Sequence, residues 1–351
     1  MKIAVTADVH LRSRKEYPER YNALENILDQ MNGENINVLV IAGDLFDTEV
    51  QNYAEFDELC KQSKYSSIQF YIIPGNHDSG IDSKYFTSEN IRIFNDPEII
   101  QPESPSPQLL FLPYVHDRSM GEIIAEYKSD LSENWILIGH GDFLSGIRTP
   151  NPYESGIYMP LSRSDILLYK PEKVFLGHIH KKMVSEKVHY PGSPCGLDIS
   201  ENGIRSFLIF DTVSLDVAER TVESDFIFLN GTLVALPIAN EFDHLKNKII
   251  KMINEWNINE ADIPKARIRI KVKGYTSDKG RLQDEINESL SAYTFYNDEK
   301  PDLTEVSVFN DPEMIRIVEK AREKIENLEW NDGITCKEDI LEQALYIILK
   351  D

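Results

Sequence analysis

Short apolar runs alternate with amphipathic stretches along residues 1–222. Each run is rich in β-branched or aromatic residues, is closed by glycine or proline, and is too short to favour a helix. Each therefore predicts a buried strand. The predicted strands cover residues 3–7, 38–42, 68–73, 109–115, 135–139 and 174–177.

The stretches between these runs show helical spacing on one face. Between the first two strands, apolar residues recur at Tyr21, Leu24, Ile27, Leu28 and Met31. Residues 120–131 repeat this pattern. Alternation of strands and helices predicts an α/β fold in which helices cover both faces of a mainly parallel sheet. Residues 183–222 instead indicate a β-meander, with a tight turn at residues 190–194.

A second region, of mixed α and β character, is predicted to begin at residue 226. It contains an amphipathic helix at 241–256, a strand at 266–272, a second helix at 279–292 and a second strand at 303–308. We expect residues 226–310 to form a small α+β cap over the site that residues 1–225 provide.

Two amphipathic helices are predicted in residues 311–351. Asp311 and Pro312 are a typical N-cap and first-turn pair, and Thr335 with Glu338 forms a capping box for the second helix. Residues 331–333 separate the two helices. Such helices can pack on their own domain, which is the commoner outcome, or serve as a docking arm for a partner.

Composition narrows the class of protein. The chain has 351 residues, enough for two or three domains, and its 37 basic and 59 acidic side chains give a net charge of −22. Strong nucleic-acid binding by this chain alone is disfavoured, because such binding draws on phosphate neutralisation. A partner would have to supply positive surface. Three scattered cysteines, no signal-like N-terminus and no long apolar run indicate a cytoplasmic protein.

Polar side chains follow five of the six predicted strands. Because ligand-binding loops of an open α/β sheet gather at the carboxyl ends of its strands, we expect these side chains to meet. Singly, an Asp-x-His or a Gly-Asp is a weak signal, whereas all five blocks at strand ends together indicate one site. They supply Asp8, His10, Asp44, Asn76, His77, Asp78, His140, His178 and His180.

The five blocks, in this order, resemble the signature of the calcineurin-like metallophosphoesterases. Within these, the chain resembles the double-strand-break repair nuclease family of the SbcD type, which includes the recombination endonuclease small subunit of large tailed phages. Gly43-Asp44-Leu45-Phe46-Asp47 and the turn at residues 190–193 carry this likeness. The resemblance implies a four-layer sandwich of two mixed β-sheets flanked by helices.

The resemblance also implies a role for each polar residue. Asp44 would bridge two metal ions, and His77 would lie over the scissile phosphate with Asp78 orienting its ring. Some family members have histidine at the position of Asp47, and the aspartate found here resembles the bacterial type, so the resemblance assigns no catalytic role to Asp47. The first ion would be held by Asp8, His10 and His180, and the second by Asn76, His140 and His178.

The ligand set consists of oxygen and nitrogen atoms only. It suits Mn²⁺, Mg²⁺ or Fe²⁺ better than a thiolate zinc site, and the resemblance favours Mn²⁺. A two-metal-activated water would hydrolyse the phosphodiester, and no serine or cysteine nucleophile is evident.

The activity that the resemblance implies is that of a DNA nuclease. It would act as an exonuclease on double-stranded DNA and an endonuclease on single strands, as a homodimer with an SMC-like ABC ATPase on the terminal helices. A phosphomonoesterase or cyclic-nucleotide phosphodiesterase would need the same metals and stays open. A catalytically dead scaffold is disfavoured by the complete ligand set.

Other polar residues have ordinary explanations as well as functional ones. His116, His189 and His244 lie outside the blocks, and a structural role is the simpler expectation for them. Arg148, in the loop at 143–149, is a candidate phosphate contact. The aromatic cluster at 293–296 would pack in a core more readily than it would stack bases. Arg267, Arg269, Lys271 and Lys273 share one strand face, which is either solvated or tracks DNA.

Overall fold

The chain divides into two compact units. The computed structural model describes residues 1–47, 52–102, 106–144, 156–238, 240–309, 311–329 and 337–349. The first unit comprises Met1–Leu197 and Ile204–Asp225, and the second comprises Asp198–Gly203 and Phe226–Asp351. The chain therefore passes between the units three times. The predicted division of labour among nuclease, cap and docking segments stays a prediction.

The first unit contains two six-stranded mixed sheets. In the first sheet, β1, β2, β3 and β4 run parallel, β13 pairs antiparallel with β1, and β14 pairs antiparallel with β13. In the second, β6, β7, β10 and β12 run parallel, with β5 and β11 antiparallel at the edges. In sheet order the strands are β14 (Val217–Thr221), β13 (Ser206–Asp211), β1 (Lys2–Thr6), β2 (Val38–Ala42), β3 (Gln69–Ile73) and β4 (Ile91–Ile93), then β11 (Met183–Ser185), β12 (Val188–Tyr190), β10 (Lys173–Gly177), β7 (Trp135–His140), β6 (Gln108–Leu112) and β5 (Glu98–Ile100).

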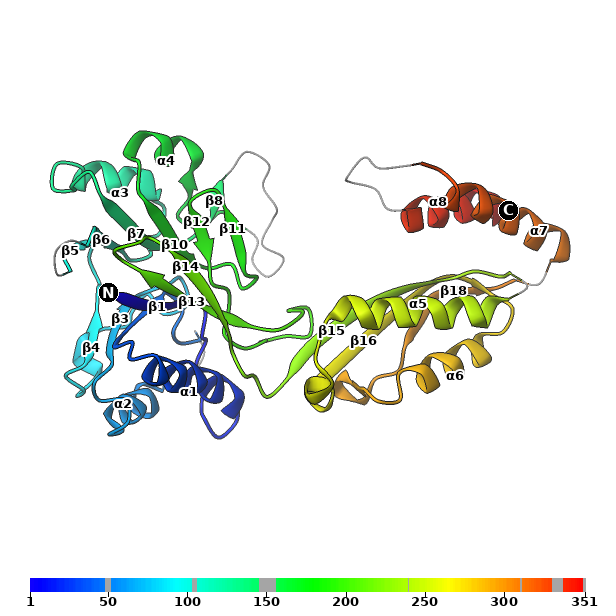
Figure 1. Cartoon of the computed structure of the whole chain (residues 1–351), viewed down its shortest axis with the longest axis horizontal. Coiled ribbons are helices and arrows are strands. Elements are labelled where there is room, and N and C mark those ends of the chain that lie inside the picture. Colours follow the sequence, from blue (N-terminus) through cyan, green and yellow to red (C-terminus); the bar gives the residue numbers. More distant parts are fainter. Residues whose placement is uncertain are drawn as a thin grey trace. The chain divides into compact units, whose positions relative to one another are not determined.

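Helices cover the outer face of each sheet (Figure 1). Helices α1 (Pro18–Gly33) and α2 (Tyr53–Lys61) bury Leu24 and Phe56 against one face of the first sheet. Helices α3 (Met120–Tyr127) and α4 (Arg163–Tyr169) bury Ile123 and Ile166 against the second sheet. The inner faces meet in a third core that includes Val40, Ile138 and Phe175. The four-layer sandwich of two mixed sheets is confirmed.

The residue pattern alone led to two errors in this unit. It predicted one mainly parallel sheet, because a continuous apolar run shows that both faces of a strand are covered but not what covers them. It also predicted a meander at 183–222, where the structure has two hairpins, β11–β12 and β13–β14, at the edges of different sheets. The predicted strand at 109–115 ends at Leu112, because Pro113 cannot donate a ladder hydrogen bond.

The described part of the first unit also contains three short elements. A 3₁₀ helix, η1 (Ser83–Tyr85), follows the third polar block, and its N-cap Asp82 accepts a hydrogen bond from the Lys84 backbone N–H. Strands β8 (Phe143–Leu144) and β9 (Leu161–Ser162) form a two-stranded sheet. Arg148 and its neighbours in the predicted phosphate-contacting loop lie outside the described residues.

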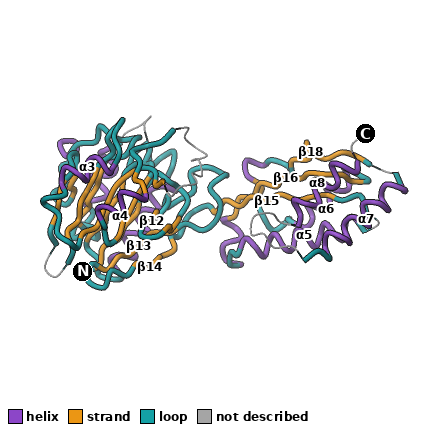
Figure 2. The backbone as a smooth tube through the Cα atoms, turned by 90° about the horizontal axis from the view of Figure 1, so that it is seen from above, coloured by secondary structure: helices purple, strands orange, loops and turns teal. Residues whose placement is uncertain are grey.

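The second unit has a sheet with α5 and α6 on one face (Figure 2). The long strand β16 (Ala266–Thr276) pairs in parallel with β15 (Ile227–Ala235), β17 (Thr294–Phe295) and β18 (Asp302–Val308). Its inward residues pack against α5 (Glu241–Trp256) and α6 (Lys279–Ser289). The pattern missed β15, a long strand that opens the unit. The 3₁₀ helices η2 (Glu260–Lys265) and η3 (Tyr296–Asp298) flank this sheet in sequence.

The basic row of β16 lies on the face opposite these two helices, and acidic neighbours neutralise most of it. Arg269 forms a two-pronged ion pair with Glu299, at 2.8 and 3.1 Å. Lys271 and Lys273 both pair with Glu305. Arg267 donates to the backbone oxygens of Pro264 and Ala266. These contacts favour the solvated-face interpretation over a DNA-tracking surface.

The terminal helices α7 (Pro312–Glu326) and α8 (Lys337–Leu349) are part of the second unit. Val318, Ile325 and Leu345 join Leu236 and Ile238 in a separate apolar core. The helix break at 331–333 and Thr335 of the predicted capping box lie outside the described residues. No helix in the described ranges combines the length and apolar character needed to span a membrane.

His189 has a structural place in the fold. It lies on β12, is buried, and its ring is 5.6 Å from that of Phe175 in the inter-sheet core. Neither ring nitrogen has a hydrogen-bond partner among the described residues. Burial, helped by the nearby Lys173 charge, lowers the pKa of His189 to about 4.

We expect this histidine to limit stability in acid. Its folded pKa lies below the ordinary value of about 6.5, so stability falls as the pH drops from about 6.5 toward 4. At pH 5 the loss is about 2 kcal/mol. His189→Leu should reduce the difference in unfolding free energy between pH 7 and pH 5, as measured by urea titration. An unchanged difference would contradict this account.

Candidate metal centre

The polar blocks meet where the carboxyl ends of strands from the two sheets come together. Asp8 and His10 follow β1, and Asp44 follows β2. The loops are joined by backbone hydrogen bonds from Asp8 N–H to the Gly43 oxygen (3.1 Å) and from His10 N–H to the Asp44 oxygen (3.0 Å). On the second sheet, His140 ends β7 and pairs in register with Gly177 of β10.

Several of these residues have left-handed backbone conformations. The φ angles are 53° at Asp8, 49° at His10, 51° at Asp44 and 95° at His178. Non-glycine residues adopt such angles at a cost of roughly 1–3 kcal/mol, and they concentrate at functional sites. Gly43 lies against the His140 ring, so closely that a Cβ there would be 2.1 Å from Nδ1. The fold thus packs these loops tightly around the blocks.

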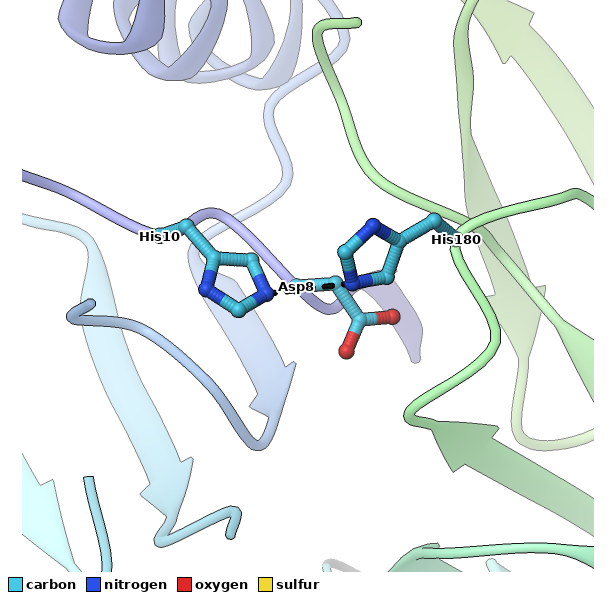
Figure 3. Close-up of side chains that lie close together, drawn as sticks. All are labelled: Asp8, His10 and His180. Atoms are coloured by element: carbon cyan, nitrogen blue, oxygen red, sulfur yellow. Dashed lines mark hydrogen bonds between the residues drawn. The ribbon is translucent and has the colours of Figure 1, made fainter. Parts of the chain in front are cut away.

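Asp8, His10 and His180 form the first group of possible ligands (Figure 3). Their ligand atoms lie within 4.8 Å of one another. The two Nε2 atoms of His10 and His180 are 3.1 Å apart. The Asp8 Oδ2 atom is buried and has no hydrogen-bond partner among the described residues. A cation between these three side chains would satisfy that oxygen, so the group fits a divalent metal.

Asp44 lies between the first group and His140. Its Oδ2 atom is 3.8 Å from Nε2 of His10 and 3.3 Å from Nε2 of His140. Asp8, Asp44 and His140 form a second group whose ligand atoms also lie within 4.8 Å. The Asn76 Oδ1 atom is 2.9 Å from Nε2 of His140. This placement fits a carboxylate shared by two ions, with Asn76 and His140 beside one of them.

His178 lies next to His140 but belongs to neither group. Its backbone N–H donates to Oδ1 of Asp8 at 2.8 Å, and its ring is 5.6 Å from the His140 ring. Its Nε2 atom is 4.0 Å from Oδ1 of Asp142, and its ring is 4.7 Å from that of Tyr158. The assignment of His178 as a metal ligand stays a prediction.

His77 is half-buried and lies at the edge of the first group. Its ring meets the His10 ring edge-on at 4.8 Å, and its backbone N–H donates to Oδ1 of Asp44 at 2.9 Å. Asp78 is buried, and its two oxygens accept hydrogen bonds from the backbones of Gly75 (2.7 Å) and Phe46 (3.1 Å). These bonds tie two loops together, while the orienting role of Asp78 stays a prediction.

Burial and neighbouring charge perturb the titration of the whole cluster. Burial lowers the pKa of His10 to about 3. Burial also opposes a charged His140, but the adjacent Asp44 outweighs it and raises the pKa of His140 to about 9. Burial raises the pKa of Asp8 above its ordinary value. Bound cations would offset the cost of keeping carboxylates ionised here.

Sequence reasoning missed three side chains at this site. Asp142 follows His140 by two residues, and its Oδ2 atom accepts a hydrogen bond from the Tyr158 backbone N–H at 2.8 Å. That short spacing was the available signal. Arg12 and Arg20 both approach Asp47, with N–O distances of 3.2 and 3.5 Å. No spacing rule predicts these arginines, because they come from a loop and from α1.

A two-sheet sandwich that gathers carboxylates and imidazoles at its strand ends is the arrangement expected of a metallophosphoesterase, a class of metal-dependent hydrolases. Residues 1–211 match the model of the calcineurin-like phosphoesterases, and the chain belongs to this family. The family membership predicted from the five blocks is confirmed.

Three curated proteins are similar in sequence. The D subunit of nuclease SbcCD from Staphylococcus saprophyticus is 26% identical over 57% of this chain and 62% of its own length. The corresponding Staphylococcus epidermidis subunit is 24% identical over 73% of this chain and 77% of its own length. A metallophosphoesterase of Bacillus subtilis, YhaO, is 26% identical over 56% and 51%. The chain thus spans less than two thirds of the first relative.

Solved structures show weaker similarity. An archaeal phosphodiesterase has a TM-score of 0.34 and 17% identity, covering 63% of this chain and all of that chain. A dimetal phosphatase from Danio rerio has a TM-score of 0.39 and 9% identity, covering 63% of this chain and 96% of its own. These scores are too low to support an argument about fold or function.

Proposed function

We propose that this chain is a manganese-dependent DNA nuclease, acting as an exonuclease on double-stranded DNA and an endonuclease on single strands. The observation that carries the proposal is the convergence of Asp8, Asp44, His10, His140 and His180 into two adjoining groups of possible ligands. The likeness to SbcCD D subunits supports nucleic acid as the substrate.

The metal set follows from the chemistry of the donors. The possible ligand atoms among the described residues are carboxylate oxygens and imidazole nitrogens, which suit Mn²⁺, with Mg²⁺ or Fe²⁺ as substitutes. When bound, two such ions supply an activated water and neutralise charge on the phosphate under attack. Asp44 would bridge the ions. Asp8, His10 and His180 would hold one, and Asn76, His140 and His178 the other.

The chain's own groups then orient the substrate and transfer protons. His77 is half-buried, and its ring contacts the His10 ring, so it lies within reach of a phosphate bound at the first group. From there it would protonate the leaving oxygen. The backbone bond to Asp44 fixes the His77 main chain, and Asp78 holds the preceding turn closed.

Partner proteins would supply the positive surface for DNA that this acidic chain lacks. We propose an SMC-like ABC ATPase docked on the terminal helices and a homodimer in solution, in a recombination or repair complex. Ile317 and Ile347 are 47% and 74% exposed and would face such a partner. Deleting α7 and α8 would expose the apolar core that they cover. Replacing Ile317 and Ile347 by aspartate avoids this damage and should prevent the ATPase from co-purifying with the chain.

The alternative is a phosphomonoesterase or cyclic-nucleotide phosphodiesterase, since either activity would use the same metal ions as DNA cleavage. Incubating the protein and Mn²⁺ with hairpin DNA, with plasmid DNA and with p-nitrophenyl phosphate separates the two. We expect DNA cleavage that EDTA abolishes, and slow turnover of the monoester. Rapid monoester or cyclic-nucleotide hydrolysis without DNA cleavage would instead establish the alternative.

A further inference from the structure

Two buried arginines hydrogen-bond to the main chain of the two histidines in the first group of possible ligands. Arg20, in the first turn of α1, donates from Nη1 to the backbone oxygen of His10. Arg205, which directly precedes β13, donates from Nη1 to the backbone oxygen of His180 at 3.0 Å. The two arginines are 7% and 8% exposed. Each histidine of the group thus has a buried guanidinium behind its main chain.

The two histidines reach the group from different sheets. His10 follows β1 of the first sheet, and His180 follows β10 of the second. Figure 3 shows their rings approaching each other beside Asp8, with the two Nε2 atoms 3.1 Å apart. Groups that act together at a site must be held within about 0.5 Å of their working positions. Binding one ion therefore requires two loops on separate sheets to keep their spacing.

On the His180 side, Arg205 ties the second sheet to the first. The strand β13 that follows it pairs with β1, and the Val222 N–H donates to the Arg205 backbone oxygen at 2.8 Å. Arg205 Nη1 also lies 3.3 Å from Oγ of Ser193, whose backbone N–H donates to the His180 oxygen at 3.1 Å. Gly192 has a φ of 77°, and a Cβ there would lie 2.7 Å from that oxygen. The His180 oxygen is therefore held from the first sheet and from its own loop.

On the His10 side, Arg20 holds a residue in a left-handed conformation. The φ of His10 is 49°, an angle that a non-glycine residue keeps only where its surroundings enforce it. The His10 N–H donates to the Asp44 oxygen at 3.0 Å, and its own oxygen accepts from Arg20, so both polar groups of its main chain are bonded. Oδ2 of Asp47 lies 3.5 Å from Arg20 Nη1 and provides a counter-charge.

We infer that Arg20 and Arg205 are positioning residues, which hold the main chains of His10 and His180 so that both rings converge on one metal ion. The inference rests on the proposed function, which assigns an ion to this group. Residues behind metal ligands orient them, and replacing such residues typically lowers metal affinity about ten- to a hundredfold.

The charge of the two arginines works against this effect. A guanidinium repels a nearby cation, so its contribution to metal binding here must come from geometry. Removing an arginine would tighten Mn²⁺ binding if charge dominated, whereas it weakens binding if positioning dominates. The sign of the change therefore distinguishes the two effects.

The test is calorimetric titration of the metal-free chain with Mn²⁺. Arg20→Met and Arg205→Met keep an unbranched side chain but lose the donor and the charge, and each should raise the Kd for Mn²⁺ about ten- to a hundredfold. Arg20→Lys and Arg205→Lys keep the charge but not the planar fork, so their Kd values should lie between those of the methionine variants and the unchanged chain.

Ser193→Ala is a milder change that tests the same arrangement. It removes the hydroxyl beside Arg205 and keeps the backbone bond to the His180 oxygen. We expect it to weaken Mn²⁺ binding about two- to tenfold. If a methionine variant does not fold, the lysine variants and Ser193→Ala decide the outcome, and binding as tight as in the unchanged chain would overturn the inference.

Arg220→Met is the control for a purely structural arginine. Arg220 lies on β14 of the same sheet, pairs with Glu34 at 2.7 and 3.2 Å, and donates to the backbone oxygen of Glu219 at 3.1 Å. Its replacement should lower the Tm in EDTA but leave the rise caused by Mn²⁺ unchanged. Arg205→Met should also reduce that rise, measured at about ten times the Kd of the unchanged chain.

The outcomes separate this inference from the proposed function. Unchanged or tighter Mn²⁺ binding in either methionine variant, or a Mn²⁺-induced rise in Tm equal to that of Arg220→Met, would overturn the positioning role of that arginine. If the unchanged chain did not bind Mn²⁺ at all, the proposed function would be wrong instead.

Discussion

Replacing His77 by alanine is expected to reduce phosphodiester cleavage by about 10²–10⁴-fold while both metal ions stay bound. The reason lies in the geometry of the turn. The His77 ring is beside His10 but outside both groups of possible ligands, and its backbone N–H contacts Asp44. An alanine keeps that backbone bond, so the metal centre keeps its shape and loses a proton donor.

Two measurements on the same protein check this expectation. Cleavage of labelled DNA gives the loss in rate, and metal analysis after gel filtration gives the number of ions retained. His116→Ala is a suitable control, because His116 is 78% exposed and lies outside the polar blocks. If His77→Ala lost its ions along with its activity, His77 would be a ligand and its assigned role would be wrong.

Replacing Asp44 by asparagine is expected to release metal and abolish cleavage together. Asp44 is the carboxylate nearest both His10 and His140, so its charge would serve both ions at once. If the ions contribute about 4 kcal/mol to the transition state, cleavage falls about 10³-fold. An asparagine still accepts the His77 N–H bond, which preserves the turn.

Thermal melting provides a readout of this change that does not depend on activity. Mn²⁺ at a hundred times its dissociation constant stabilises a folded protein by about 2.7 kcal/mol, so the unchanged chain should melt higher with Mn²⁺ than with EDTA. Asp44→Asn should lose most of that difference, whereas Asp117→Asn, at an exposed position, should keep it. A metal-induced rise that survived in Asp44→Asn would show that the ions bind elsewhere.

The elements of the fold were largely predictable from local pattern. The helix predicted at 241–256 has those bounds in the structure, and the strand predicted at 38–42 is β2. Local pattern does not tell which strands share a sheet, because Val40 and Ile138 read alike whether they face a helix or another sheet. The four-layer arrangement therefore came from the family resemblance. Strand β15 was missed, since its alternation is interrupted at Asn230-Gly231.

The candidate site was predictable as far as strand ends reveal it. Each block directly follows its strand, so the meeting of Asp8 and Asp44 follows from the parallel pairing of β1 and β2, whereas His140 reaches them from the second sheet. Side chains that reach the site across the fold carry no such mark in the sequence. Arg12 comes from a loop and Arg20 from a helix face, and both need coordinates to be placed.

The segment Asp198–Gly203 belongs to the second unit although it precedes the last part of the first unit in sequence. This connection affects how the chain would respond to proteolytic cleavage. Gly203 donates to the Phe228 oxygen at 2.9 Å, and Asn230 bonds to Asn202 and Ile199 at 2.7 and 2.8 Å. After proteolytic cleavage between Asp225 and Phe226, these hydrogen bonds would therefore still hold the two fragments together. A fragment that ends at Asp225 would keep residues 198–203 but would lose the residues of the second unit that they contact.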